Sequence, residues 1–389
     1  MNNKIGIHTF NTSFDISEII YDDILRQLFE YASVNKCRLI PDKKELTKKQ
    51  IRRFLNIADK IDNDWNYNRS WTLDLRQRGL NIVLQEMAIF DKEHKRNKDI
   101  KPVKFVNYCI RYIVNPAQIM GGDYYNIYTE NHFIDVCNRI DEITASVCEL
   151  LPSMHDIYLR RIDFCRDITL DSQKHIDTYI EILQKYQKHK RFRLLWLPAG
   201  NNRRVLPMGS MTLQRGATML YIYDKFYEMW SKRSHYPAED IFKSEGILRL
   251  ELRIYNDKIY YEKKKRGLEN TLDFLNESMK LARHFFGYYL KILFCEGDYY
   301  SYDRANEIIE NSRHTEKTKA KLKTLLECIS DRHSINGGIN AMIECGYKAY
   351  QINYAINQLN ELNVNPVTIS RRTNIEYLPN LLRYINAMD

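Results

Sequence analysis

Three segments in which polar and apolar residues alternate constrain the fold of this chain more than any other feature. They cover residues 160–167, 220–228 and 248–254. Successive side chains of a β-strand point to opposite faces, so alternation predicts strands with one polar and one apolar face. We expect the three strands to be neighbours in one antiparallel sheet, with an apolar layer beneath their polar faces.

The polar faces of these strands carry tyrosines and ionisable side chains. As neighbours, the strands would gather Arg161, Asp163, Asp167, Tyr221, Tyr223, Lys225, Arg249, Glu251 and Arg253. A phenol, a lysine and carboxylates are the groups needed for metal-assisted attack on a phosphodiester. Because a free tyrosine has a pKa of about 10, we expect Lys225 to favour the phenolate of Tyr223. Oxygen ligands suit Mg²⁺ or Mn²⁺, so Asp163, Asp167 and Glu251 are the predicted metal ligands.

Two alternatives to a catalytic site at Tyr223 are compatible with the sequence. The charged residues of the first and third strands also fit a ladder of cross-strand salt bridges, which stabilises a sheet without chemistry, and Tyr223 fits a packed side chain. Tyr260 and Tyr261 form a second candidate pair, beside the cationic run Lys263, Lys264, Lys265 and Arg266. No two histidines stand two residues apart, and no Gly-rich phosphate loop is present, which argues against a His-x-His metal cluster and a built-in helicase.

Composition narrows the class of protein and its partners. Lys and Arg number 59 against 50 Asp and Glu, and this net charge of +9 favours a polyanionic partner. The eight cysteines are scattered without a Cys-x-x-Cys pair, which is typical of a reducing cytosol and argues against structural zinc. No signal peptide is visible and no run of about eighteen apolar residues occurs, so we expect a cytoplasmic protein without a membrane partner.

The remaining pattern predicts an α+β fold, in which helices flank a central antiparallel β-sheet and a mainly helical C-terminal region follows. Residues 1–100 are expected to hold a strand at 4–12, a helix at 17–34, a basic helix at 42–62 and a charge-rich stretch at 65–99 that is helical or mixed. Residues 101–268 are expected to form the catalytic sheet, with a further strand at 104–114 and helices at 132–151 and 175–189.

Residues 269–389 read as helical. Within them, helices at 338–345 and 350–362 joined through Gly346 form a candidate helix-turn-helix, although helical hairpins are common in small helical domains. This makes the region a candidate DNA-binding module. Residues 367–369 are expected to form a short strand.

These motifs resemble the gene II/X family of phage and plasmid replication proteins, the rolling-circle initiators of filamentous phages. The resemblance runs from about residue 104 to the C-terminus. It rests on residues 114–122, Arg161-Ile162-Asp163, and residues 220–228 and 248–253. The last of these, followed by Tyr260-Tyr261, is also similar to staphylococcal-type plasmid initiators.

The resemblance implies a Rep-like nuclease that nicks the plus strand at a replication origin, keeps the 5′ phosphate on a tyrosine and later rejoins the strand. It implies Tyr223 as nucleophile by the phage motif, or Tyr260 or Tyr261 by the plasmid motif, with Mg²⁺ or Mn²⁺ as cofactor. Origin DNA would be bound by Arg161, Arg249, Arg253, Lys263, Lys264, Lys265 and Arg266. A host helicase and single-strand-binding protein are expected partners. A conjugative relaxase and a non-cleaving DNA-binding regulator are the alternatives.

Overall fold

The computed structural model describes residues 5–45, 67–90, 103–186, 192–195, 197–199, 203–205 and 209–386. Its strands are β1 (Ile5–Ile16), β2 (Arg38–Glu45), β3 (Tyr67–Leu75), β4 (Leu80–Phe90), β5 (Val103–Val114), β6 (Tyr158–Thr169), β7 (Arg193–Leu194), β8 (Leu197–Ala199), β9 (Arg203–Val205), β10 (Ser210–Arg215), β11 (Thr218–Asp224), β12 (Ile247–Tyr255), β13 (Tyr299–Tyr300) and β14 (Tyr377–Leu378). Ten of them form one antiparallel sheet in the order β2-β3-β4-β5-β1-β6-β12-β11-β10-β7. The predicted α+β class, with its antiparallel sheet, is confirmed.

The α-helices are α1 (Glu18–Asn35), α3 (Pro116–Ile119), α4 (Ile134–Val147), α5 (Gln173–Gln184), α6 (Lys225–Ser231), α7 (Ala238–Lys243), α8 (Asn256–Arg266), α9 (Thr271–Leu293), α10 (Tyr302–Glu310), α11 (Glu316–Asp331), α12 (Ile335–Glu344), α13 (Ala349–Glu361) and α14 (Leu381–Asn386). The short 3₁₀ helices are η2 (Arg76–Arg78), η5 (Arg233–His235) and η6 (Arg371–Thr373). Within the described ranges, no helix combines the length and apolar character needed to cross a bilayer.

The chain divides into two compact units, each assembled from segments that are distant in sequence. The first unit comprises Met1–Gly6, Phe164–Ile254 and Met279–Asp389, and the second comprises Ile7–Asp163 and Tyr255–Ser278. The units are therefore interleaved along the chain. The predicted division into residues 1–100, 101–268 and 269–389 followed the order of the sequence instead.

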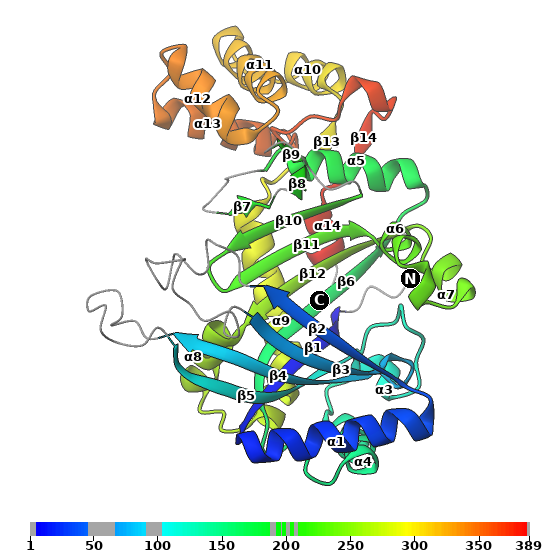
Figure 1. Ribbon diagram of the computed structural model, residues 1–389. Coiled ribbons are helices and arrows are strands. Elements are labelled where there is room, and N and C mark those ends of the chain that lie inside the picture. Colours follow the sequence, from blue (N-terminus) through cyan, green and yellow to red (C-terminus); the bar gives the residue numbers. More distant parts are fainter. Residues whose placement is uncertain are drawn as a thin grey trace. The chain divides into compact units, whose positions relative to one another are not determined.

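In the second unit, α1 lies along one face of the strands β2, β3 and β5 (Figure 1). Ser17 caps this helix by accepting a hydrogen bond from the backbone N–H of Ile20. The apolar face of α1 is buried, through Tyr21, Ile24 and Leu28. The helix predicted at 17–34 and the strand predicted at 104–114 are thus present.

At two places in the second unit the structure has strands where helical structure was expected. Residues 42–45 of the basic helix predicted at 42–62 belong to β2, whose backbone pairs with β3 from Arg38 opposite Asp74 to Glu45 opposite Tyr67. The rest of that prediction lies outside the described part of the chain. The described part of the stretch at 65–99, predicted as helical or mixed, consists of β3, η2 and β4, and the two strands pair from Leu75 opposite Leu80 outward. Pairing between strands outweighed the local charge pattern in both places.

In the first unit, α5 packs on β10 and β11, and Ile176, Ile180 and Leu183 are among its buried residues. Helices α10 to α13 gather together, with α11, α12 and α13 side by side (Figure 1). The mainly helical C-terminal region is therefore confirmed. The strand predicted at 367–369 is wrong, because Ile369 forms only an isolated bridge with Ser301.

A buried carboxylate holds the last part of the first unit in place. Asp298, which is 1% exposed, accepts hydrogen bonds from the Asn380 backbone N–H at 2.9 Å and from the Tyr377 hydroxyl at 3.1 Å. It also accepts from the Asn363 side chain at 2.9 Å and forms an ion pair with Arg383. A buried charge is tolerated when it is paired and hydrogen-bonded in this way.

Candidate active site

The register of β11 and β12 in the first unit places the predicted polar residues on one face. Tyr221 lies opposite Glu251 and Tyr223 lies opposite Arg249. The intervening residues of β11, such as Ile222, are fully buried on the other face. The sequence alternation therefore predicted this shared face correctly for β11 up to Asp224 and for β12.

A chain of polar contacts links the two tyrosines of β11 to β12. The Tyr223 hydroxyl donates to Glu251 Oε2 at 3.1 Å. Arg253 Nη2 donates to Glu251 Oε1 at 2.8 Å, and Arg253 Nη1 donates to the Tyr221 hydroxyl at 3.1 Å. The guanidinium carbon of Arg253 is 4.5 Å from the centre of the Tyr221 ring. Glu251 therefore receives one phenol and one guanidinium, each on a different oxygen.

The environment of Tyr223 keeps its phenol protonated. Burial raises its pKa well above the ordinary value of 10, and the negative charge of Glu251 raises it further. The Tyr223 side chain is nevertheless partly exposed. Attack by this oxygen therefore requires that its proton leave during the reaction, and Glu251 is the acceptor already in contact.

Arg249 is fully buried and is held by a bidentate ion pair. Its Nε and Nη2 atoms donate to the two oxygens of Asp167, on β6, at 2.6 and 2.7 Å. Burial alone would lower the pKa of Arg249, but Asp167 outweighs burial and holds the pKa well above its ordinary value. The fork geometry of a guanidinium suits such a pair. Asp167 and Arg249 thus stabilise one another beside Tyr223.

Lys225 does not continue the strand as predicted. Asp224 ends β11 and caps α6, because its side chain accepts from the Tyr227 backbone N–H at 3.1 Å. Lys225 is the first residue of the helix, and its Nζ donates to Glu228 Oε2 at 2.9 Å. An aspartate followed by a glutamate in the first turn was the sequence signal for this helix start.

The ammonium group of Lys225 is 6.0 Å from the centre of the Tyr223 ring. Burial lowers the pKa of Lys225, and Arg249 lowers it further, whereas Glu228 raises it. Lys225 therefore adds positive charge near Tyr223, but Glu228 is its direct partner.

Asp163 and Arg161 belong to the second unit. Asp163 is fully buried, accepts from the Thr9 hydroxyl at 2.8 Å and pairs with Arg161 Nη2 at 3.0 Å. Each of the three predicted metal ligands therefore has an arginine partner: Arg161, Arg249 or Arg253. Among the described residues, no three His, Cys, Asp or Glu side chains converge on a point where a metal could be held. These carboxylates do not fit a preformed divalent-cation site.

The second tyrosine pair lies on α8, in the second unit. Tyr260 is 66% exposed and Tyr261 is 56% exposed. Lys258 Nζ is 4.9 Å from the centre of the Tyr261 ring, and Lys263 donates to the Glu269 carbonyl at 2.9 Å. The cationic run predicted to bind DNA forms the last turn of this helix. Both tyrosines are accessible, but within the described part of the chain neither donates a hydrogen bond to a carboxylate.

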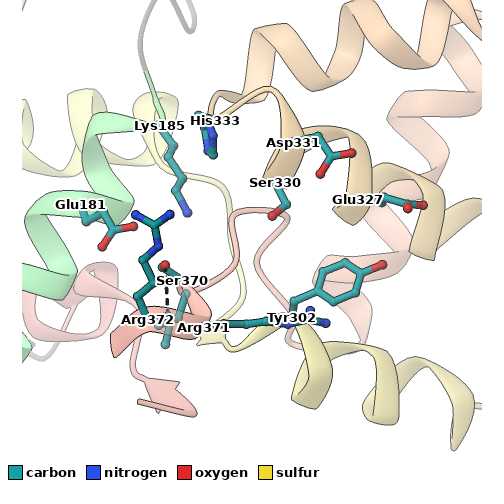
Figure 2. A pocket seen from close by; sticks show the side chains of 11 residues that line it. Glu181, Lys185, Tyr302, Glu327, Ser330, Asp331, His333, Ser370, Arg371 and Arg372 are labelled. Carbon is teal, nitrogen blue, oxygen red and sulfur yellow. Dashed lines mark hydrogen bonds between the residues drawn. The ribbon is translucent and has the colours of Figure 1, made fainter. Parts of the chain in front are cut away.

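A cavity of about 610 Å³ in the first unit was not predicted from the sequence (Figure 2). Its charged side chains are Glu181, Lys185, Glu327, Asp331, Arg371 and Arg372. Lys185 donates to the Thr368 carbonyl at 2.9 Å, and Arg371 pairs with Asp303 at 2.6 Å. Three acids and three bases balance, so the cavity does not select one sign of ligand charge. Its residues come from separate segments, which is why no motif marks it.

A scan with protein-family models and a search of curated proteins found no match to this chain. The resemblance to rolling-circle initiators therefore rests on the sequence motifs. The site itself is a tyrosine and a glutamate in contact on adjacent strands, surrounded by ion pairs.

Proposed function

We propose that this chain is a rolling-circle replication initiator that nicks and rejoins one DNA strand at an origin through Tyr223. The observation that carries the proposal is the 3.1 Å contact between the Tyr223 hydroxyl and Glu251, on a partly exposed face with Arg253 beside it. A nucleophile hydrogen-bonded to a base that is oriented by a third group is the arrangement used in covalent catalysis. The net charge of +9 supports a nucleic-acid substrate.

In the proposed reaction, Glu251 takes the proton of Tyr223 as the phenol oxygen attacks the scissile phosphorus. The new bond joins phosphorus to the tyrosine oxygen, and the bond between phosphorus and the 3′ oxygen breaks. The departing 3′ oxygen takes a proton from water and becomes a 3′ hydroxyl. Rejoining is the reverse, in which the 3′ hydroxyl displaces the tyrosine and the phenol recovers its proton. General base catalysis of this kind supplies about 10²- to 10⁴-fold in rate.

Arg253 is the cation best placed to hold the phosphate oxygens. Its guanidinium bridges Glu251 and Tyr221, and its side chain keeps 19% of its surface exposed. Arg249 is fully buried and doubly bonded to Asp167, so its role is to position the strands. Transfer of the Tyr223 proton would neutralise Glu251 and free Arg253 for the phosphate.

A non-cleaving DNA-binding regulator is the second candidate. The raised pKa of Tyr223 and the pairing of each predicted metal ligand with arginine favour it. The two candidates differ in one product, which is a covalent bond between protein and DNA.

The test is incubation of the full chain with supercoiled plasmid bearing the cognate origin, with and without Mg²⁺ or Mn²⁺. We expect open circles with protein attached to the 5′ end. Tyr223→Phe should abolish the covalent adduct and leave DNA binding unchanged. Tyr260→Phe and Tyr261→Phe should still form the adduct. A fully active Tyr223→Phe variant would overturn the assignment, and wild-type binding without any adduct would favour the regulator.

A further inference from the structure

Helices α11, α12 and α13 form a three-helix arrangement in which the second and third helices are joined by a tight turn. Helix α12 ends at Glu344, and Gly346 follows in the left-handed region with φ of 89°. The Tyr347 N–H bonds to the Met342 carbonyl at 3.0 Å and the Gly346 N–H to the Ile343 carbonyl at 2.9 Å. This pair of bonds is a Schellman motif, which requires glycine or asparagine at the position of Gly346.

The next helix begins almost at once. The Lys348 backbone N–H donates to the Gln351 side chain at 2.8 Å, which fixes the start of α13. Gly338 allows α12 to approach α11 closely, because a Cβ at this position would lie 2.6 Å from the Ile329 Cα. Ile352, Ala355 and Leu359 form the buried side of α13. A short turn with glycine and a third helix packed on the first two are the features of a helix-turn-helix.

The outer side of α13 carries hydrogen-bonding groups at helical spacing. Tyr350 is 67% exposed and Tyr354 is 45% exposed, and Asn353 and Asn357 are exposed between and beyond them. Spacings of three and four residues place all four on one face. An exposed carboxamide on a helix is the group that pairs with the N6 and N7 positions of adenine in the major groove.

Positive charge lies along this face. Lys321 of α11 has its Nζ 5.3 Å from the centre of the Tyr354 ring, and Lys348 is exposed at the start of α13. Of the acids on α12 and α13, Glu344 pairs with Arg332 at 3.2 Å and Glu361 is the last residue of α13. The N-terminal part of a recognition helix makes the base contacts, and no acid precedes Glu361 in α13.

We propose that α13 is the recognition helix of a sequence-specific site for duplex DNA. Asn353 and Asn357 read base edges in the major groove, while Lys321 and Lys348 contact phosphates on either side. The inference rests on the proposed function only in assigning origin recognition to this helix. The predicted helix pair at 338–345 and 350–362 is present, with its turn at Gly346.

The experiment is a selection of random-sequence duplex DNA by the full chain, in which only binding is scored. We expect one sequence motif to be enriched. The double variant Asn353→Ala, Asn357→Ala should bind the selected duplex at least tenfold more weakly, with unchanged affinity for a scrambled duplex. Asn311→Ala, a change at an exposed asparagine outside these helices, is the matched control.

Lys321→Ala should weaken binding to both duplexes alike, because a phosphate contact carries no sequence information. Far-UV circular dichroism checks that each variant is folded. Enrichment of no motif, or an unchanged affinity of the asparagine double variant, overturns the inference. The inference is also overturned if the wild-type protein sediments as a dimer and the asparagine double variant as a monomer, because α13 would then bind a second copy of the chain. If the wild-type protein binds the enriched motif but never nicks it, the proposed function is wrong, whereas this inference is supported.

Discussion

Tyr223 and Glu251 meet because two strands with the same alternation pair in a fixed register. The residue types and their common face could be read from the sequence, since period-two alternation determines which side chains share a side. The side chains that pair with the charged residues of this face could not be read from the sequence. Arg249 binds Asp167, which precedes it by 82 residues. Arg253 binds Glu251, which had been predicted as a metal ligand. Such pairings depend on side-chain packing, which no spacing rule specifies.

Replacement of Glu251 by glutamine tests the proposed proton acceptor. Glutamine keeps an oxygen that accepts from Tyr223 but does not take its proton, so we expect adduct formation to slow by about 100-fold or more. The measurement is the rate of covalent complex formation with origin DNA, with near-UV circular dichroism as a check on the fold. Glu245→Gln, at an exposed glutamate of the same unit, serves as the control. Wild-type rates in Glu251→Gln would exclude Glu251 as the base.

Glu228 should contribute to stability in a pH-dependent way. Burial alone would raise its pKa from 4.5, but Lys225 and Lys232 outweigh burial and the pKa falls to about 2. A lowered carboxyl pKa stabilises the fold above the unfolded value, and this contribution is lost as the pH falls from about 4.5 to about 2.

We therefore expect Glu228→Gln to lower the free energy of unfolding at pH 7 by about 2 kcal/mol, because Lys225 stays buried without its partner. The difference from wild type should shrink towards pH 2, as measured by urea unfolding across this range. Glu239→Gln, which alters an exposed pair with Lys243, should show little change. A gap that is constant with pH would contradict the role of the Glu228 charge.

At the scale of elements, apolar periodicity located the long helices and the strands with clean alternation. Helix α1, strand β5 and the helix pair α12 and α13 follow the predicted pattern closely. Strand β2 was missed because its lysines suggested a solvated helix, whereas its backbone pairs with β3 along its whole length. The end of β11 was missed because the alternation of Tyr221, Tyr223 and Lys225 hid the helix cap at Asp224.

Gly338 provides a test of how closely α12 packs on α11. An added methyl group would lie 2.6 Å from the Ile329 Cα and 2.7 Å from its backbone nitrogen, so the helices must separate. We expect Gly338→Ala to destabilise the fold by about 1–3 kcal/mol in urea unfolding. Gly287→Ala in α9 is the control, because a Cβ there meets no atom within 4 Å and alanine favours a helix. Equal stabilities of the two variants would argue against the close approach.

For the whole molecule, the sequence predicted the fold class and the helical C-terminal region but not the interleaved units. The first unit joins Met1–Gly6 to Phe164–Ile254, and the second joins Ile7–Asp163 to Tyr255–Ser278. Such long-range association leaves little local signal in the sequence. Net charge, in contrast, is a property of the whole chain that composition does give.

The surplus of nine positive charges should make DNA binding strongly dependent on salt. Each phosphate contact releases counterions, so with about three contacts we expect affinity to fall more than tenfold between about 50 and 200 mM salt. Fluorescence anisotropy with a labelled duplex measures this slope. The double variant Lys264→Gln, Lys265→Gln should give a shallower slope if the last turn of α8 binds DNA. An affinity that does not vary with salt would rule out phosphate contacts as the main source of binding.

The carboxylate of Asp298 ties the final stretch of the chain to a residue some eighty positions earlier. A protein shortened after Asn374 would lose Tyr377, Asn380 and Arg383 together, which leaves the Asn363 side chain as the remaining one of the four partners described for the Asp298 carboxylate. Removal of this stretch would therefore also destabilise the segment around Asp298. Shortened proteins should unfold around β13 and become sensitive to proteases there, instead of simply losing a tail.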